Sequence, residues 1–425
     1  MNTQELKKGF ANREHDELLA GIYVDTSKIA YQSDRYVNAI ESYEKAFGED
    51  DVTIYSAPGR SEVGGNHTDH QHGEVLAASI NNDAIAIVKP LSENVVKVIS
   101  DGYDLITINL DNLDLVEDEK GTTTSLIKGV LAGVKEHGFQ IGGFQAYITS
   151  DVLIGAGLSS SAAFETIIGT ILSGLYNDMK ISAIEIAIIG QYAENVYFGK
   201  PCGLMDQMAC SVGGMVHIDF ADSSNPVVEP VAFDIAKHGY SLCITDTKGS
   251  HADLTDDYAA IPVEMKQVAN FFGKDFLHEV SKDELMNNLA AIREKTNDRA
   301  VLRALHFVEE NERVKAEVAA LKADDIACFL QTVKASGNSS YKFLQNVYTN
   351  HDVLHQNVSI ALCVSEMVLG DNGVCRVHGG GFAGTIQAFV KDTAVADYKA
   401  QMNAIFGEGA CSVLKIRKYG GMKVM

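Results

Sequence analysis

The stretch DVLIGAGLSSSAAFETIIGTIL, residues 151–172, decides the fold because it combines the end of a strand, a turn and the start of a helix. Gly155 and Gly157 favour the turn, and the serine run at 159–161 opens a helix rich in apolar residues. Backbone N–H groups at such a helix N-terminus, with glycines removing steric cover, form an anion site. The stretch therefore predicts a strand–turn–helix unit that binds phosphate.

Two common nucleotide-binding signatures do not match this stretch. A Walker loop needs G-K-[ST], which is absent, and the run GAGLSS has the wrong third position for a dinucleotide fingerprint. An ordinary serine-capped helix is the alternative when the stretch is taken alone, and three consecutive serines beside two glycines disfavour it. The predicted phosphate site is therefore of neither common kind.

Length and composition narrow the class of protein. A chain of 425 residues is long enough to bury more than one core, so we expect two domains. A hydrophobic content of 46% and a charged content of 22% are typical of a soluble globular protein. The formal net charge of -22 argues against a nucleic-acid partner, since binding a phosphate backbone needs a basic surface. A small phosphorylated ligand stays compatible, because backbone amides and one metal ion hold it locally.

The cysteines and the N-terminal segment indicate the cellular setting. Seven cysteines are dispersed without a C-x-x-C pair, which fits buried thiols in a reducing cytosol better than a disulfide framework. The segment MNTQELKKGFANREHDELLAG is charged and lacks the apolar core of a secretory signal. No apolar run reaches the ~18 residues of a membrane span. We therefore expect a cytoplasmic protein with no membrane partner, and no obligate protein partner is evident.

Strand-like and helical segments alternate without a regular βαβ rhythm, so the sequence predicts an α+β fold in two lobes. The polar run ADSSNPVVEP at 221–230 is the best linker candidate, and the predicted domains are residues 1–225 and 226–425. A capping-box pattern, Ser182 with Glu185, opens one of the helices. Strands are expected at 52–55, 74–80, 84–91, 95–100, 143–152, 215–220, 240–247, 375–390 and 412–425, and helices at 35–48, 125–138, 159–176, 182–198 and over much of 256–368.

A second glycine-rich segment, SAPGRSEVGGNHTDHQHGEVLAA at 56–78, is crowded with polar side chains. If this loop is buried, its polar groups need partners, and a polyhydroxylated ligand supplies them. A solvated surface loop is the alternative. A zinc site on His67, His70 and His72 is disfavoured, because one flexible loop lacks the helical or C-x-x-C spacing that fixes tetrahedral geometry. We expect His70 and His72 to shape the loop or to be exposed.

Two further segments contain candidate site residues. In AENVYFGKPCGLMDQMACSVGG, residues 193–214, Glu194 projects from a helix end. Asp206 lies among small and apolar residues, where an acid is either paired or functional, and a helix-capping role is its alternative. The third glycine-rich segment, CRVHGGGFAGTIQAFV at 375–390, predicts a tight turn, for which a simple hairpin is the alternative.

In order and content these segments resemble the GHMP small-molecule kinases and, within them, the galactokinases, from about residue 35 to the C-terminus. GRSEVGGNHTDHQHG at 59–73 resembles the G-R-x-N-x-x-G-E-H-T-D-Y-N-x-G signature. LIGAGLSSSA at 153–162 matches the phosphate loop of the family, except that Leu153 replaces proline. PCGLMDQ at 201–207 and GGGFAG at 379–384 match the P-C-G-x-M-D-Q and G-G-G-F-x-G motifs, and HADLTDDYAAI resembles the segment ending in S-x-E-Y.

The resemblance implies a two-lobed GHMP kinase fold in which ATP and a sugar meet in the cleft between the lobes, with Mg²⁺ as cofactor. It implies a sugar 1-kinase that phosphorylates the anomeric C1 hydroxyl of a hexose, first of all galactose. Asp206 would be the acid facing that hydroxyl, and Arg60 its partner. By motif position, the expected sugar-binding residues are Asn66, His67, Asp69, Gly203 and Tyr258, the ATP-binding residues are Gly155, Ala156, Gly157, Leu158, Ser159, Ser160 and Ser161, and the metal-binding residues are Ser160 or Ser161 with Glu194.

Phosphoryl transfer depends mainly on alignment and charge neutralisation, which a metal ion, a cationic side chain and helix amides provide. Arg60 is able to stabilise either the ionised Asp206 or the charge that develops during transfer. Asp206 acts as a general base if it takes the proton, and otherwise only orients the hydroxyl. The sequence leaves both mechanisms open.

The chain departs from the family pattern on the sugar side. Asn66 stands where the family has a glutamate that usually helps to hold the far hydroxyl of the sugar, and Glu62 stands where the family has an asparagine. Gly337 stands where a histidine is usual. An amide tolerates a carboxylate or a modified C6 better than a glutamate does. The alternatives are therefore a kinase for galacturonate, arabinose or an N-acetylhexosamine, a sugar sensor without catalysis, which the retained catalytic set disfavours, and a zinc hydrolase.

Overall fold

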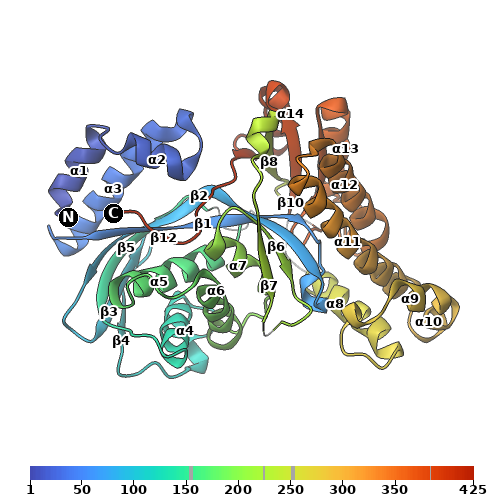
Figure 1. Ribbon diagram of the computed structural model, residues 1–425, viewed down its shortest axis with the longest axis horizontal. Coiled ribbons are helices and arrows are strands. Elements are labelled where there is room, and N and C mark those ends of the chain that lie inside the picture. Colours follow the sequence, from blue (N-terminus) through green and yellow to red (C-terminus); the bar gives the residue numbers. More distant parts are fainter. Residues whose placement is uncertain (153–156, 224, 250–253, 383) are drawn as a thin grey trace.

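The computed structural model describes residues 1–152, 157–223, 225–249, 254–382 and 384–425. In this part of the chain the strands form one sheet of eight strands and one of four, with helices packed against both (Figure 1). This mixed architecture confirms the predicted α+β class. None of the helices in the described ranges is long and apolar enough to cross a membrane.

The eight-stranded sheet is formed by strands between residues 53 and 231, together with β12 near the C-terminus. Its order is β12-β1-β2-β5-β3-β4, and β6 pairs with both β2 and β7. The pairs are antiparallel except for β3 with β5, which is parallel. The strands are β1 (Thr53–Gly64), β2 (Glu74–Pro90), β3 (Val95–Ser100), β4 (Ile106–Asn109), β5 (Phe144–Ser150), β6 (Met215–Asp219), β7 (Val227–Val231) and β12 (Met422–Lys423).

Strands β1 and β2 are longer than the sequence predicts. Strand β1 runs on from the predicted 52–55 through Arg60, and 74–80 and 84–91 form one strand where two are predicted. The polar run at 81–83 stays extended because its side chains find buried partners. The Asn81 Oδ1 atom accepts a hydrogen bond from the Lys415 amide at 2.9 Å, and Asp83 forms ion pairs. Buried polar groups therefore continue a strand where composition indicates a turn.

Helices cover both faces of the large sheet (Figure 1). Alternate residues of β2 point to opposite faces, since the side-chain period of a strand is two. Ala86 packs with Ile127 and Ile167 on one face, whereas Ile87 packs with the N-terminal helices on the other. Of these helices the sequence analysis predicts α3, at 35–48, and misses α1 and α2. The helices are α1 (Thr3–Ala11), α2 (Asp16–Tyr23), α3 (Ile29–Phe47), α4 (Thr123–Glu136), α5 (Ser160–Tyr176), α6 (Ala183–Tyr192) and α7 (Met205–Val212).

The second half of the chain forms the smaller sheet, which is antiparallel with the order β11-β8-β10-β9. Its core is shared with the large sheet, because Val63 and Leu76 cluster with Leu242, Val314 and Phe389. The elements are β8 (Tyr240–Asp246), β9 (Gly373–His378), β10 (Thr385–Lys391), β11 (Cys411–Leu414), α8 (Thr255–Phe271), α9 (Lys282–Asn287), α10 (Leu289–Lys295), α11 (Asp298–Lys322), α12 (Ile326–Ser339), α13 (Asn357–Leu369) and α14 (Val395–Phe406).

The segment predicted as a linker, 221–230, is partly a strand, which corrects the expectation. Strand β7 pairs with β6 at the edge of the large sheet, where Pro230 is tolerated because an edge strand leaves one side without ladder partners. The C-terminal segment also returns to this sheet, since β12 pairs with β1. The division of the domains at 225 and 226 stays a prediction.

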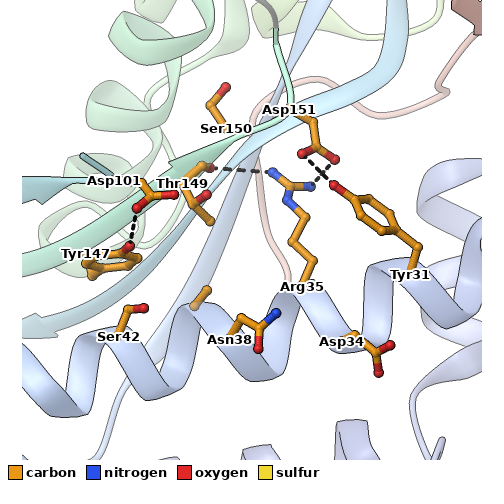
Figure 2. A pocket seen from close by; sticks show the side chains of 11 residues that line it. Tyr31, Asp34, Arg35, Asn38, Ser42, Asp101, Tyr147, Thr149, Ser150 and Asp151 are labelled. Carbon is orange, nitrogen blue, oxygen red and sulfur yellow. Dashed lines mark hydrogen bonds and ion pairs between the residues drawn. The ribbon is translucent and has the colours of Figure 1, made fainter. Parts of the chain in front are cut away.

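A buried ion-pair cluster ties helix α3 to the start of the phosphate-loop segment. Arg35 contacts Asp83 at 2.6 Å. It also contacts Asp151 at 3.4 Å, and the Tyr31 hydroxyl donates to Asp151 at 3.0 Å (Figure 2). Arg417 contacts Asp83 from the opposite end of the chain at 2.9 Å. A polar pocket of about 360 Å³ opens beside Arg35 and Asp151. The first residue of the phosphate-loop segment, Asp151, is therefore held in place by Arg35 and Tyr31.

Candidate active site

Arg60 and Asp206 form a bidentate ion pair at the centre of the site. Arg60 lies on β1, and Asp206 lies in the first turn of α7. The Nε and Nη2 atoms of Arg60 donate to the two carboxylate oxygens of Asp206 at 2.7 and 2.8 Å. Such a fork is both strong and geometrically specific. Arg60 is buried, but 32% of the Asp206 side chain is exposed, so a substrate is able to reach the carboxylate.

The ionisation of Asp206 is controlled by its partners. Burial alone would raise the pKa of this carboxyl, but the ion pair with Arg60, and after it the hydrogen bond from the Ser159 hydroxyl, outweigh burial and hold the pKa below its ordinary value. Asp206 is therefore a carboxylate at neutral pH. It accepts hydrogen bonds and does not donate them.

The described end of the phosphate loop lies against this pair. The Nη1 atom of Arg60 donates to the Gly157 carbonyl, and its backbone amide donates to the Leu158 carbonyl at 3.1 Å. Gly157 has a φ of +68°, and a Cβ atom there would lie 3.0 Å from the Thr385 hydroxyl, so the turn favours glycine. Ser160 is the first residue of α5, whose leading N–H groups have no partner within the helix. Gly155 and Ala156 lie outside the described residues.

Ser161 and Glu194 are brought together as the sequence predicts. The Ser161 hydroxyl donates to Glu194 at 3.2 Å, and Glu194 is almost fully buried. The predicted helix 182–198 begins with the expected capping box, but its last part is a π-helix, η4 (Ala193–Phe198). Glu194 projects from this π-helical turn, a distortion that is frequent at functional sites.

Three residues around Glu194 are missed by the sequence analysis. The Gln207 amide donates to Glu194 at 2.9 Å and to Glu165 at 3.0 Å, and Lys200 reaches Glu194 at 3.2 Å. Burial, and next the charge of Glu194, raises the pKa of Glu165 well above its ordinary value. Gln207 is the last residue of the PCGLMDQ motif and Lys200 directly precedes this motif, so their place in the chain is the signal that would have identified them.

Of the residues predicted to bind the sugar, Asp69 and Gly203 lie in contact. Asp69 begins a short 3-10 helix, η2 (Asp69–Gln71), and a Cβ atom on Gly203 would lie 1.9 Å from its carboxylate oxygen. Any larger residue at 203 would displace Asp69. Burial, and next the charge of Asp206, raises the pKa of Asp69 to about 6.

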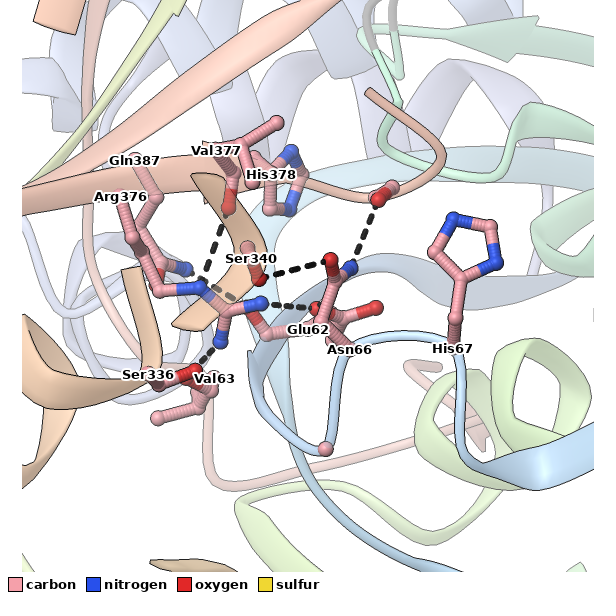
Figure 3. A network of polar contacts seen from close by, with 12 residues as sticks. Glu62, Val63, Asn66, His67, Ser336, Ser340, Arg376, Val377, His378 and Gln387 are labelled. Atoms are coloured by element: carbon pink, nitrogen blue, oxygen red, sulfur yellow. Dashed lines mark hydrogen bonds and ion pairs between the residues drawn. The ribbon is translucent and has the colours of Figure 1, made fainter. Parts of the chain in front are cut away.

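The remaining predicted sugar residues reach the third glycine motif. The His67 Nε2 atom lies 3.1 Å from the Gly380 carbonyl, and the Tyr258 hydroxyl donates to the Gly381 carbonyl at 2.9 Å. Asn66 is fully buried and its amide is hydrogen-bonded on every side by protein groups (Figure 3). A direct sugar contact by Asn66, as the sequence predicts, would have to break one of these hydrogen bonds.

The other two histidines of the polar loop have structural surroundings. Both ring nitrogens of His70 are buried, and burial lowers its pKa to about 3, so the exposed alternative is excluded for His70 and the loop-shaping one remains. The His72 ring stacks on Phe276 with centroids 3.6 Å apart, which is a loop-shaping contact. Within the described part of the chain, no three His, Cys, Asp or Glu side chains are arranged to hold a metal ion by themselves. This arrangement gives no support to zinc on the polar loop.

Comparisons with known proteins agree with this geometry. Residues 125–214 match the GHMP kinases N terminal domain, and residues 41–90 match the galactokinase galactose-binding signature. A galactokinase of Actinobacillus pleuropneumoniae serotype 5b is 30% identical over 362 residues, which are 84% of this chain and 90% of that protein. A galactokinase of Streptomyces coelicolor is 28% identical over 355 residues, which are 84% of this chain and 89% of that protein.

Solved structures show the same fold. The crystal structure of Lactococcus lactis galactokinase complexed with galactose has a TM-score of 0.77 and 24% identity, and covers 90% of this chain and 98% of that one. A crystal structure of mevalonate kinase has a TM-score of 0.60 and 15% identity, with 86% of this chain and 99% of that chain covered. The predicted GHMP kinase fold is thereby confirmed.

Proposed function

Because this chain belongs to the galactokinases of the GHMP kinase family, we propose that it transfers the γ-phosphoryl group of ATP to the anomeric C1 hydroxyl of galactose. The observation that supports the reaction best is the Arg60–Asp206 pair. On one side it contacts Gly157 and Ser159 of the phosphate loop, and on the other it lies near Asp69. Phosphate-binding and sugar-binding groups thus meet at one carboxylate.

In this proposal Asp206 receives the C1 hydroxyl as a hydrogen-bond donor. The hydroxyl oxygen attacks the γ-phosphorus, the bond to the bridging oxygen of ADP breaks, and the proton passes to Asp206 or leaves with the phosphoryl product. Arg60 keeps the carboxylate ionised and fixes its orientation. The first N–H groups of α5, together with Ser159 and Ser160, bind the phosphates of ATP. His67, Asp69, Gly203 and Tyr258 surround the sugar.

The residues near α5 fit a magnesium ion. A serine hydroxyl and a buried carboxylate, Ser161 and Glu194, lie 3.2 Å apart, and oxygen donors of this kind are those that Mg²⁺ prefers. The ion, when bound, would neutralise charge on the ATP phosphates. Gln207 and Lys200 hold the carboxylate of Glu194 in place.

Replacing Glu194 with glutamine should raise the Mg²⁺ concentration needed for half-maximal rate by at least about tenfold, because the metal loses a charged ligand. Titration of Mg²⁺ at saturating ATP and galactose measures this. Glu185→Gln is the matched control, since Glu185 belongs to the capping box of the same helical segment and contacts solvent. An unchanged Mg²⁺ requirement in Glu194→Gln would remove this residue from the metal site.

Galactose affinity should increase as the pH rises through about 6, the pKa to which burial raises Asp69. Below that pH the carboxyl is neutral. Above it the carboxylate accepts hydrogen bonds from sugar hydroxyls, and these charge-assisted bonds are stronger. The dissociation constant, measured by calorimetry between pH 5 and 8, should change by up to about tenfold per pH unit below the pKa. Asp69→Asn should bind more weakly and without this dependence; the same pH profile in the variant would assign it to another group.

The substrate is tested by an assay that couples ADP release to a detectable reaction across a panel of free sugars. Galactose should give the highest kcat/KM, ahead of galacturonate, arabinose and N-acetylgalactosamine. A rate that is negligible with galactose and high with one of the other sugars would overturn the assignment of substrate and leave the kinase chemistry intact. Absence of ADP release with every sugar, in protein that binds galactose, would instead indicate a sensor.

A cytoplasmic location also belongs to the proposal. ATP is the co-substrate, and the cysteines of the chain are free thiols, which suits a reducing compartment. Galactose and ATP are the partners that the reaction requires.

A further inference from the structure

Three consecutive backbone carbonyls of the third glycine motif are held by side chains from distant segments. The Gly379 carbonyl accepts from Asn66 at 2.8 Å, and the Gly381 carbonyl accepts from Tyr258 at 2.9 Å. Between them, the Gly380 carbonyl lies 3.1 Å from His67 Nε2, which is therefore the protonated nitrogen of that ring. The turn 379–381 is thus fixed by the same side chains that the sequence assigns to the sugar.

Asn66 has no hydrogen-bonding capacity left for a ligand. A primary amide offers two N–H donors and two acceptor positions on its oxygen. The donors reach Glu62 at 3.0 Å and the Gly379 carbonyl at 2.8 Å. The oxygen accepts from Ser340 at 3.1 Å and from Asn346 at 2.9 Å. Asn66 is 0% exposed, so every polar position of this side chain is used inside the protein.

The surroundings require an amide at this position and not an acid. Glu62 and the Gly379 carbonyl both accept hydrogen bonds, so they fix the nitrogen side of Asn66. Glu62 is itself held by Arg376, a buried ion pair in the same network (Figure 3). A Cβ atom on Gly337 would lie 2.9 Å from the Cβ atom of Arg376, so a larger residue at 337 would displace the arginine.

We propose that Asn66 is a positioning residue, whose amide fixes the glycine turn 379–381 against the polar loop of segment 56–78 without contacting the sugar. This inference rests on the proposed function, because the turn carries the carbonyls that orient His67 and Tyr258. It changes what recognises the substrate. The end of the sugar farthest from C1 contacts a turn of fixed shape, and the side-chain amide of Asn66 does not form a hydrogen bond with any sugar hydroxyl.

The test compares galactose with its 2-, 3-, 4- and 6-deoxy analogues in wild type and Asn66→Ala. A positioning residue lowers kcat/KM by the same factor, about tenfold, for galactose and for each analogue that the wild type accepts. A residue that contacts one hydroxyl gives a loss that disappears with the analogue lacking that hydroxyl. This second pattern would overturn the proposal. Asn94→Ala is the control, because Asn94 is an exposed amide on a distant loop. It should leave kcat/KM unchanged for galactose and for every analogue.

Two further variants keep the proposal testable if Asn66→Ala folds poorly. Ser340→Ala removes only one of the four hydrogen bonds and should give a smaller loss of the same uniform kind. Asn66→Asp places a second carboxylate against Glu62, so its loss should exceed that of Asn66→Ala, and Glu62→Gln in the same chain should recover part of it. No recovery in the double variant would contradict the charge complementarity assigned to this pair.

Hydrogen exchange of the free protein separates this inference from the proposed function. In the absence of sugar and ATP, the backbone amide hydrogens of residues 379–382 should exchange at least about tenfold faster in Asn66→Ala than in the wild type. Those of β10 and β8 should exchange at the same rate in both proteins. Unchanged exchange in the turn would overturn the positioning role even if galactose is the substrate. A wild type that phosphorylates no sugar would overturn the proposed function and leave the exchange result valid.

Discussion

Replacing Asp206 with asparagine should lower kcat by about 10²- to 10⁴-fold while galactose still binds. The substitution keeps the size of the side chain but removes its charge. The C1 hydroxyl then loses its carboxylate acceptor, and Arg60 loses the partner that it contacts at 2.7 and 2.8 Å. Steady-state rates and calorimetric galactose binding measure the two quantities separately.

Ser159→Ala is the informative companion to this variant, because it removes only the hydroxyl that donates to Asp206. Its loss in kcat should be much smaller, since the ion pair with Arg60 remains. Asp111→Asn, which neutralises an exposed acid away from the site, is the control and should leave kcat unchanged. Rates near those of the wild type in Asp206→Asn would exclude this carboxylate from the reaction, and galactose binding lost together with kcat would point to a purely structural role.

Asp83→Asn should destabilise the protein by about 3–5 kcal/mol, because it breaks a buried ion-pair cluster, takes from Arg417 its acidic partner and leaves Arg35 with Asp151 alone. Asp83 is fully buried and contacts Arg35 at 2.6 Å and Arg417 at 2.9 Å. It also accepts hydrogen bonds from the Ser56 and Tyr23 hydroxyls. Urea unfolding followed by circular dichroism measures the loss.

The matched control removes an exposed ion pair from the same sheet. Lys97 contacts Glu93 at 3.3 Å near the surface, and Lys97→Ala should change stability by less than about 1 kcal/mol. If Asp83→Asn also lowers the free energy of unfolding by less than about 1 kcal/mol, the charges of the two arginines are stabilised by solvent when Asp83 is neutral, which would contradict the prediction. Because Arg35 also contacts Asp151, we expect the affinity for ATP to weaken in Asp83→Asn even where the protein is folded.

The members of the proposed catalytic centre are predictable from the sequence because each of them lies in a short motif. Arg60, Asp206 and Glu194 are each recognised by their immediate neighbours in the chain, and the structure brings them together with Ser159 and Ser161. The capping box that opens α6 is likewise a local pattern, and it is formed as predicted. Local patterns of this kind depend on residues a few positions apart.

The errors have a common physical cause, which is that distant partners satisfy polar groups. The run 81–83 has the composition of a turn, but it is part of strand β2 because the Lys415 amide and the Arg417 side chain bind its polar side chains. Asn66 has the motif position of a sugar ligand, but Ser340 and Asn346, more than 270 residues away in the chain, saturate its amide. No local pattern contains these partners. Helix α3 is predicted at 35–48, but α1 and α2 are missed, because the apolar residues that they pack against lie on α3 and on the strands β1 and β2.

The central claim is that this chain phosphorylates galactose at C1, and product NMR tests it most directly. Galactose and ATP are incubated with the wild-type protein and with Asp206→Asn, and the proton and phosphorus spectra of the product are recorded. The account predicts a single sugar phosphate whose anomeric proton is split by phosphorus, formed by the wild type and nearly absent with the variant. A phosphate coupled to any other sugar proton, or no phosphorylated galactose from the wild type, would contradict it.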